Sequence, residues 1–262
     1  MTREDKLTSR DITRDLDTDF FAQTVLCYDS IDSTNDKAFR LAEQGAKEGT
    51  CVLAEHQKKG KGRLGRSWIS PRGRGILLSM ILRPEIAPAE VARVTLVTAV
   101  SLVKTARGFL RKRLGIKWPN DIVFQDQKVG GILTEMSAEP DRVHFVVVGV
   151  GINVNADPAA LPPGALSLGQ VAGKEVSRLD FTRAFLETWE KDYRRFKKGR
   201  FAELAAEWEE FSATSGRRVS AILSHRKIQG QATGIDEDGA LWIRKDNGLQ
   251  ERVLAGDIEH LR

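Results

Sequence analysis

The pattern of hydrophobic and polar positions in the first half of the chain alternates between strand and helix signals. Three apolar, β-prone runs predict strands, over 25–31, 50–57 and 75–82. Between the first two runs, Ser33 is placed to cap a helix that ends at Gly45. The long apolar stretch 89–115 predicts a second helix with glycine at its end.

The second half of the chain predicts strands, then helices, then strands again. Residues 116–154 predict a strand, a hairpin and two further strands, with a tight turn at Asp126-Gln127. A loop with paired prolines spans 155–174, and 178–213 predicts two helices that break at Gly199. Aromatic residues at helical spacing in those helices indicate core positions.

The character of the sequence changes again near Thr214. Short β segments there are separated by DEDG and DNG turns, which is typical of a small all-β barrel. The predicted fold class is therefore α+β: a mixed or antiparallel sheet with helices over 1–213, followed by a small barrel over 214–262. The first 24 residues predict a tail or a short helix.

The composition is that of a folded globular chain. Of its 262 residues, 41% are hydrophobic and 29% are charged, so the chain has enough apolar residues for a core and disorder is not indicated. Cys27 and Cys51 give no disulfide framework, and the four scattered histidines lack the spacing of a zinc site. With no signal-peptide pattern and no apolar stretch of about 20 residues, we expect a cytoplasmic protein without a membrane partner.

The stretch KKGKGRLGRSW, from Lys58, matches two phosphate-binding patterns at once. Its glycines spell G-x-G-x-x-G, and it nearly spells a P-loop, with Arg66 in place of the lysine. Both patterns need a helix that opens at the glycines. Pro71 and two further glycines would break such a helix, and a second strand follows instead. We therefore interpret the stretch as a glycine-rich loop between two strands.

This basic loop, residues 58–75, carries many lysines and arginines and no acid. A solvated, mobile surface segment is one interpretation. A lid over an anionic, partly aromatic ligand is the other, because arginine forks grip phosphate and Trp68 is able to stack on a ring. The loop by itself leaves both interpretations open. The net charge of +5, much of it in this loop, fits a small anionic ligand as well as nucleic acid.

A second informative segment is IKWPNDIVFQDQKVGGIL, which carries Lys117, Asn120, Asp121 and Lys128 on one hairpin. Each residue alone has an ordinary structural explanation, as turn chemistry or as an exposed lysine. Together they place a lysine beside two glycines, where backbone permits close approach. A carboxylate near a cationic loop also suggests a Mg²⁺–phosphate site, with Asp121 as the ligand.

The segments DSTNDKA, GKGRLGRSW, KWPND, KVGGILTE and GVGINVN, in this order and spacing, resemble the biotin protein ligases. The resemblance runs from about Tyr28 to the C-terminus and implies a class II synthetase-like catalytic domain with an SH3-like barrel. One departure is Lys61, which stands where the family has arginine; it keeps the charge and loses the fork. The roughly 25 residues before the pattern leave no room for the winged helix-turn-helix of repressor-type members, so no DNA binding is expected.

The resemblance implies that biotin and MgATP form biotinyl-5′-AMP, and that biotin then passes to one lysine of a biotin carboxyl carrier protein domain. Lys128 and Arg63 are the expected catalytic residues. The positions matching biotin contacts are Ser33, Thr34, Asn35, Gln57, Gly60, Lys61, Gly62, Arg63 and Lys128. The positions matching ATP or adenylate contacts are Arg63, Arg66, Trp68, Asn120, Lys128 and Asn153. Asp121 matches a Mg²⁺ position, and many relatives form a homodimer.

Three rival interpretations compete with this resemblance. A lipoate or octanoate transfer enzyme shares the catalytic fold, but KWPND and the terminal barrel argue against it. A nucleic-acid-binding protein would use the basic loop, yet no helix-turn-helix or aromatic-interleaved basic sheet is evident. A biotin-sensing regulator without ligase activity would have no use for the chemistry-bearing Lys128 and Asp121.

Overall fold

The computed structural model describes residues 6–223 and 226–261. Its first half contains α1 (Ser9–Thr13), β1 (Val25–Tyr28), α2 (Thr34–Glu43), β2 (Cys51–Ala54), β3 (Gly75–Leu82) and α3 (Val91–Arg107). The hairpin region contains β4 (Gly115–Lys117), β5 (Asp121–Phe124), β6 (Gln127–Ala138) and β7 (Val143–Asn153). Then follow α4 (Leu168–Ala172), α5 (Arg178–Lys197), α6 (Phe201–Phe211), β8 (Arg218–Ile222), β9 (Lys227–Ile235), β10 (Leu241–Arg244), β11 (Gln250–Val253) and β12 (Asp257–His260).

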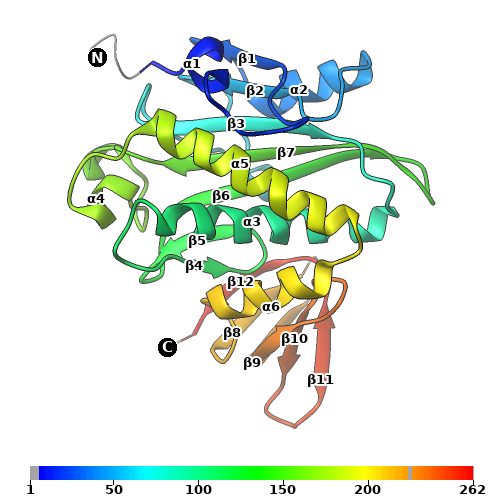
Figure 1. Ribbon diagram of the computed structural model, residues 1–262. Coiled ribbons are helices and arrows are strands. Elements are labelled where there is room, and N and C mark those ends of the chain that lie inside the picture. The colour runs from blue at the N-terminus through cyan, green and yellow to red at the C-terminus, as the bar shows by residue number, and fades with distance from the viewer. Residues whose placement is uncertain (1–5, 224–225, 262) are drawn as a thin grey trace.

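The large sheet has seven strands in the order β1-β2-β3-β7-β6-β5-β4. Strands β1 and β2 pair in parallel, and each of the other neighbouring pairs is antiparallel. The sheet is therefore mixed, and the predicted α+β class is confirmed. Helices α3 and α5 cross one face of it, while α2 lies near the edge that β1 and β2 form (Figure 1).

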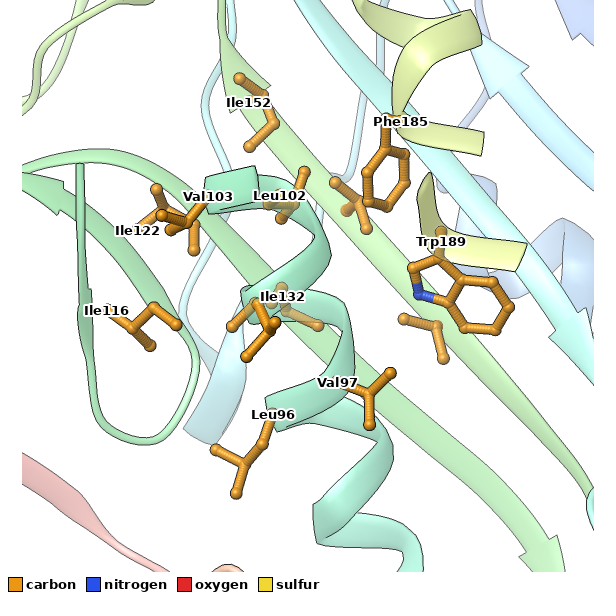
Figure 2. Close-up of a cluster of buried hydrophobic side chains, with 14 of the residues drawn as sticks. Leu96, Val97, Leu102, Val103, Ile116, Ile122, Ile132, Ile152, Phe185 and Trp189 are labelled. Atoms are coloured by element: carbon orange, nitrogen blue, oxygen red, sulfur yellow. The ribbon is translucent and has the colours of Figure 1, made fainter. Parts of the chain in front are cut away.

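The main core lies between the sheet and the pair α3 and α5. Side chains that alternate along the strands, such as Ile132 and Ile152, meet Leu102 of α3 together with Phe185 and Trp189 of α5 (Figure 2). Each of these five side chains is at most 2% exposed. Because successive strand residues point to opposite faces, the residues between them lie on the other face, where the candidate site is built.

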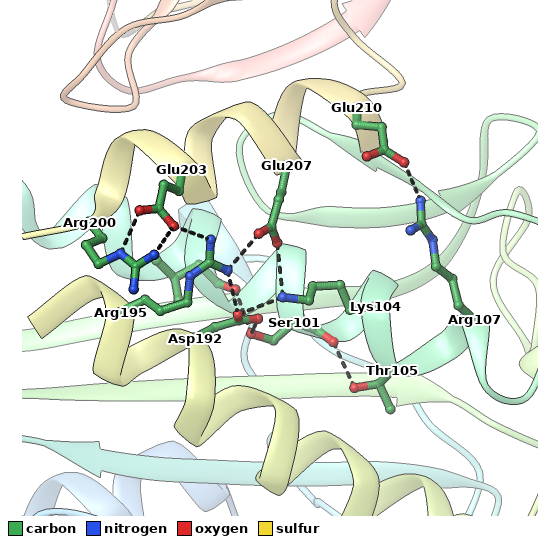
Figure 3. Close-up of polar contacts among 11 residues, drawn as sticks. Ser101, Lys104, Thr105, Arg107, Asp192, Arg195, Arg200, Glu203, Glu207 and Glu210 are labelled. Atoms are coloured by element: carbon green, nitrogen blue, oxygen red, sulfur yellow. Dashed lines mark hydrogen bonds and ion pairs between the residues drawn. The ribbon is translucent and has the colours of Figure 1, made fainter. Parts of the chain in front are cut away.

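A network of charged side chains joins α3, α5 and α6 (Figure 3). Asp192 of α5 is 1% exposed and accepts hydrogen bonds from Ser101 Oγ at 2.9 Å and Lys104 Nζ at 2.7 Å. Arg195 and Lys104 also donate to Glu207 of α6. A buried carboxylate is tolerated when it is paired and hydrogen-bonded in this way. The network fixes α6, which leads directly into the second sheet.

The second sheet has five strands, all antiparallel, in the order β11-β10-β9-β8-β12. It fits the small barrel-like domain that the turn signals predicted. Trp118 anchors it to the large sheet: its backbone N–H donates to Thr214 Oγ1 at 3.0 Å, and its indole Nε1–H to the carbonyl of Gly239 at 3.1 Å. Asp126 adds an ion pair with Arg217 at 2.6 Å, and its Oδ1 lies 2.8 Å from His260 Nδ1.

Some predicted boundaries were wrong. The helix predicted over 89–115 ends at Arg107, because the chain turns at Gly108 and buries Leu110 and Leu114 on its way to β4. The tight turn lies at Gln125-Asp126, one residue earlier than predicted, and both residues have positive φ. The predicted break at Gly199 is confirmed, since its φ of 73° separates α5 from α6.

Two further segments contain short helices in their described parts. Among the first 24 residues, the described part contains α1, whose Ile12 is fully buried, so the alternative of a short helix is confirmed. The loop 155–174 contains α4, which Ser167 and Gln170 cap at its start and Gly173 ends in the left-handed region. No helix within residues 6–223 and 226–261 is long and apolar enough to cross a membrane.

Candidate active site

The candidate site lies on the face of the large sheet opposite α3 and α5. There, cross-strand partners form a row of Leu77, Gly151, Gly131 and Asp121, and the next row contains Ser79, Gly149 and Leu133. The three glycines leave space above the sheet. A Cβ at Gly151 would lie 2.5 Å from the Trp68 ring, and one at Gly149 would overlap the Asn35 amide. Glycine is therefore required where Trp68 and Asn35 lie directly on the strands.

One end of the site is lined by uncharged hydrogen-bonding groups at the N-terminus of α2. Gln57 Oε1 accepts from the Thr34 N–H at 2.7 Å and from Thr34 Oγ1 at 2.9 Å. Ser79 Oγ lies 2.8 Å from Thr34 Oγ1 and 2.6 Å from Asn35 Oδ1. Ser33 caps the helix with its side chain. Thr34, Asn35 and Ser79 are buried, so their orientation is fixed before a ligand arrives.

Sequence reasoning missed two members of this network. Ser79 is fully buried and is the one polar residue in the apolar strand Gly75–Leu82, which is the signal that could have found it. Glu135 of β6 accepts from Asn35 Nδ2 at 2.7 Å and lies 3.8 Å from Lys61 Nζ. Asn35 thus has hydrogen-bond partners on two strands, β3 and β6, because its Nδ2 also donates to the Leu133 carbonyl at 3.3 Å.

The basic loop folds back on itself over the glycine rows. The Trp68 N–H donates to the Gly60 carbonyl at 2.9 Å, and the Gly62 N–H to the Arg66 carbonyl at 2.6 Å. A Cβ at Gly60 would overlap the Trp68 carbonyl. Only a short 3₁₀ turn, Arg63–Gly65, follows the first glycines. The absence of an α-helix there bears out the rejection of the dinucleotide and P-loop patterns.

Each cation predicted for the site has an acidic neighbour. Lys61 forms an ion pair with Asp36, and this hydrogen bond raises the pKa of Lys61. Lys128 Nζ lies 2.7 Å from Asp121 Oδ1. Arg63 and Arg66 both form ion pairs with Asp257 of β12. Burial lowers the pKa of the Arg63 guanidinium, while the carboxylates of Asp257 and Asp121 act in the opposite direction.

Lys128 is positioned by a β-bulge and by the proline-containing loop. Ile122 pairs with Gly130 and Val123 with Lys128, so Val129 is an extra residue in β6. The Lys128 N–H donates to the Gly164 carbonyl at 2.8 Å, and its own carbonyl accepts from the Leu166 N–H at 2.8 Å. Its Nζ lies 5.6 Å from the centroid of the Trp68 ring. The ammonium group therefore stands over the glycine rows beside the indole.

A cleft runs between these parts. Its walls include most of the residues that sequence reasoning selected: Ser33, Thr34, Asn35, Gln57, Lys61, Gly62, Arg63, Arg66, Trp68, Asn120 and Lys128. The selected residues outside this lining are Gly60, Asp121 and Asn153. Gly60 lies against the Trp68 carbonyl, Asp121 forms an ion pair with Lys128, and Asn153 Nδ2 donates to the Leu166 carbonyl at 3.2 Å. Trp68 Nε1 and Asn153 Oδ1 are buried without a hydrogen-bond partner among the described residues.

Comparison with known proteins shows the family to which the chain belongs. Residues 27–153 match the Biotin/lipoate A/B protein ligase family, and residues 214–261 match the biotin protein ligase C terminal domain. The chain therefore belongs to the biotin/lipoate protein ligase family. Within it, the C-terminal match and two of the three relatives below are named for biotin ligases.

Three relatives illustrate the likeness. The Bifunctional ligase/repressor BirA of Bacillus subtilis is 36% identical over 97% of this chain and 79% of its own length. The Biotin--[acetyl-CoA-carboxylase] ligase of Paracoccus denitrificans is 34% identical over 84% of this chain and 93% of its own. The structure of the biotin protein ligase from Aquifex aeolicus in complex with biotin and ATP has 30% identity and a TM-score of 0.78, covering 92% of this chain and 99% of that one.

Proposed function

We propose that this chain activates biotin with ATP to biotinyl-5′-AMP and transfers biotin to a lysine of a biotin carboxyl carrier protein domain. The observation that carries the proposal is the polarity of the cleft. One end presents neutral donors and acceptors from Thr34, Asn35 and Gln57, and the other presents Arg63, Arg66 and Lys128. A ureido ring, which both donates and accepts hydrogen bonds, suits the first end, and a carboxylate with phosphates suits the second.

In the first step, a biotin carboxylate oxygen attacks the α-phosphorus of ATP, and pyrophosphate leaves. Two anions approach each other, so fixed positive charge at the reacting atoms lowers the barrier. In this proposal Lys128 and Arg63 supply that charge, while Arg66 binds phosphate. Trp68 packs against the ligand, and Asn120 and Asn153 contact the adenylate.

In the second step, the amine of the acceptor lysine attacks the acyl carbon of the mixed anhydride, and AMP leaves as the proton is released. No covalent enzyme intermediate is needed, because the anhydride is already activated. The basic loop acts as a lid over the adenylate in this scheme, which limits hydrolysis. Its closed path over Gly131 and Gly151 supports that role.

Magnesium belongs to the same proposal. Asp121 Oδ1 is 2.7 Å from Lys128 Nζ, so the nearest carboxylate is already paired with a cation. Across the part of the chain that the structure describes, no group of three or more His, Cys, Asp or Glu is arranged to hold a metal. This donor set fits a Mg²⁺ ion that takes most of its oxygen ligands from ATP phosphates and water, with Asp121 assisting. When bound, the ion would neutralise phosphate charge.

We extend the proposal to organisation and setting. Residues 1–213 form the catalytic domain and 214–262 the SH3-like barrel. The acceptor belongs to a biotin-dependent carboxylase in the cytoplasm, where ATP and the carboxylase meet. A homodimer and the absence of DNA binding stay predictions from the resemblance.

The test is ATP–pyrophosphate exchange by the purified chain with Mg²⁺, comparing biotin, lipoate, octanoate and no acid. Exchange that depends on biotin alone is the expected result. Exchange with lipoate or octanoate instead would assign the chain to the sister activity. If the folded protein shows no exchange with any of the three acids, the adenylation step is refuted and a binding or regulatory role is left.

A further inference from the structure

Asp257, the first residue of β12, contacts two of the arginines of the basic loop, Arg63 and Arg66, across the boundary between the two sheets. Its Oδ1 accepts from Arg63 Nη1 at 3.0 Å, and its Oδ2 forms an ion pair with Arg66 Nη2. The neighbouring Gly256 carbonyl accepts from Arg63 Nη2 at 3.1 Å. The barrel therefore supplies two acceptors to the Arg63 guanidinium.

The two arginines are held to different degrees. Arg63 also donates to Asn120 Oδ1 at 3.1 Å, and Asn120 is itself fixed by a 2.9 Å bond from its Nδ2 to the Ile132 carbonyl. The Arg63 side chain is 19% exposed and is thus held between Asn120 and the barrel. The Arg66 side chain is 62% exposed, and Asp257 is its acidic partner. An exposed ion pair of this kind exchanges partners at little cost.

The turn before β12 is shaped for this contact. Gly256 has a φ of 152°, and a Cβ there would lie 2.9 Å from the Ile222 carbonyl. Only glycine fits at that point, so the chain presents the Gly256 carbonyl and the Asp257 carboxylate side by side. The attachment of the barrel does not depend on this pair, because Trp118 and Asp126 hold the same two sheets together elsewhere.

We propose that Asp257 is a positioning residue for the adenylation step, through which the C-terminal barrel orients Arg63 toward the cleft. Asp257 keeps Arg63 against Asn120, whereas Arg66 exchanges Asp257 for a ligand phosphate when the nucleotide binds. Two arginines that share one carboxylate also repel each other less than two unpaired ones. The catalytic effect of Asp257 rests on the proposed function. The contact between Asp257 and the two arginines rests only on the geometry.

The kinetic test compares Asp257→Asn with Asp126→Asn in biotin-dependent ATP–pyrophosphate exchange. The first variant removes the carboxylate from the arginines, and the second removes a carboxylate that joins the same two sheets away from the cleft. We expect Asp257→Asn to lower kcat/KM for ATP by about tenfold, the effect of one charge-assisted hydrogen bond, with KM for biotin changed less than about twofold. Asp257→Glu should recover most of the loss. Asp126→Asn should match the wild type in both constants.

A second measurement does not require activity. Trypsin cleaves after arginine and lysine, so the rates of cutting after Arg63 and Arg66, followed by mass spectrometry in the absence of ligand, report how firmly Asp257 holds them. Cutting after Lys59, whose side chain is 77% exposed and pairs with Asp32, is the internal reference. We expect the two arginine cuts to accelerate several-fold relative to that reference in Asp257→Asn and not in Asp126→Asn.

The outcomes separate the two ideas. If Asp257→Asn matches Asp126→Asn in the arginine cuts, the proposed contact is wrong. If the cuts accelerate and kcat/KM for ATP is unchanged, the positioning role is wrong. If the wild type shows no biotin-dependent exchange while the cuts still accelerate, the proposed function fails and the contact between Asp257 and the loop stands.

Discussion

Lys128 and Gly131 lie three residues apart in β6 and yet face the same side of the sheet. In a regular strand, residues an odd number apart point to opposite faces. The bulge removes that constraint. Val129 is an extra residue of β6 with no partner in β5, so the alternation of faces is interrupted between Lys128 and Gly131. As a result, a Cβ added to Gly131 would lie 3.1 Å from Lys128 Cε and 3.2 Å from Nζ. The bulge is what brings the lysine over the candidate site.

Gly131→Ala should therefore impair adenylation more than folding. The new methyl group would press on Lys128 and also on the Trp68 ring, 3.3 Å away. Displacement of a catalytic group by a fraction of an ångström to one ångström costs about tenfold to a hundredfold in rate, and overpacking typically costs about 1–3 kcal/mol. Single-turnover formation of biotinyl-5′-AMP, measured beside a urea unfolding curve, would check this. A rate equal to that of the wild type would contradict it.

Lys128→Ala should abolish most of the adenylation activity while the fold survives. The lysine side chain is 38% exposed, so its removal leaves no cavity in the core. Loss of one group that stabilises transition-state charge costs about 10²–10³ in kcat. The measurement is biotin-dependent pyrophosphate exchange, with a thermal unfolding scan as the check on folding. Lys128→Arg is the matched control, since it keeps the charge and should retain part of the rate. Wild-type turnover in Lys128→Ala would contradict the catalytic role assigned to this lysine.

The sequence predicted the elements well wherever one rule acted alone. The capped helix after Ser33 and the break at Gly199 depend on local chemistry, and both are present as predicted. The end of α3 was missed because the apolar residues Leu110 and Leu114 continue a helical pattern while they pack against the core from an irregular segment. Periodicity alone does not separate these cases.

The candidate site was predictable in its residue types and less so in its arrangement. The resemblance supplied Thr34, Gln57 and Lys128, and all three line one cleft. Asp257 carried no signal, because its contact with Arg63 joins residues that are 194 positions apart. The alternation of Gly149 and Gly151 with valines was visible in GVGINVN, but only the strand pairing shows that both glycines face the cleft.

Gly149→Ala should weaken biotin binding specifically. A Cβ at Gly149 would overlap the Asn35 amide and displace it from Ser79 and Glu135. KM for biotin should rise by about tenfold, as expected when one buried hydrogen-bonding group is misplaced. Steady-state exchange kinetics would measure this.

The control is Gly130→Ala on the opposite face of the same sheet. Its Cβ would press on the end of the Ile152 side chain in the core. Overpacking of this kind destabilises the fold by about 1–3 kcal/mol. Gly130→Ala should therefore lower the unfolding free energy and leave KM for biotin unchanged. If both variants raised KM equally, the effect would come from general destabilisation and the assignment of Asn35 to the biotin end would lose its support.

The two cysteines should be inert in the folded protein, which would exclude a thiol nucleophile in either reaction step. Burial raises the pKa of Cys27 to about 11, with the Glu55 carboxylate adding to the effect, and burial raises the pKa of Cys51 to about 12. A raised thiol pKa leaves the unreactive neutral form. At pH 8 alkylation should therefore be about two orders of magnitude slower at Cys27, and about three orders slower at Cys51, than in the urea-unfolded chain, where the pKa is about 8.5. Iodoacetamide labelling followed by mass spectrometry measures both rates. Labelling of the native protein at the unfolded rate would show that the thiols are accessible and ionised.

The basic loop should become resistant to proteolysis when its ligands bind. In the structure the loop crosses the site with Trp68 against Gly131 and Gly151, and the Arg66 and Lys59 side chains are largely exposed. Biotin and ATP together would give Arg63, Arg66 and Lys128 anionic partners and so order the loop over the adenylate. Cutting within 58–74 should slow in the presence of both ligands and less with biotin alone. A variant with Lys128→Ala, which is expected to bind biotin and form little adenylate, should show only the smaller protection. Equal cutting with and without ligands would mean that the segment is a solvated surface loop, the other interpretation that its composition allows.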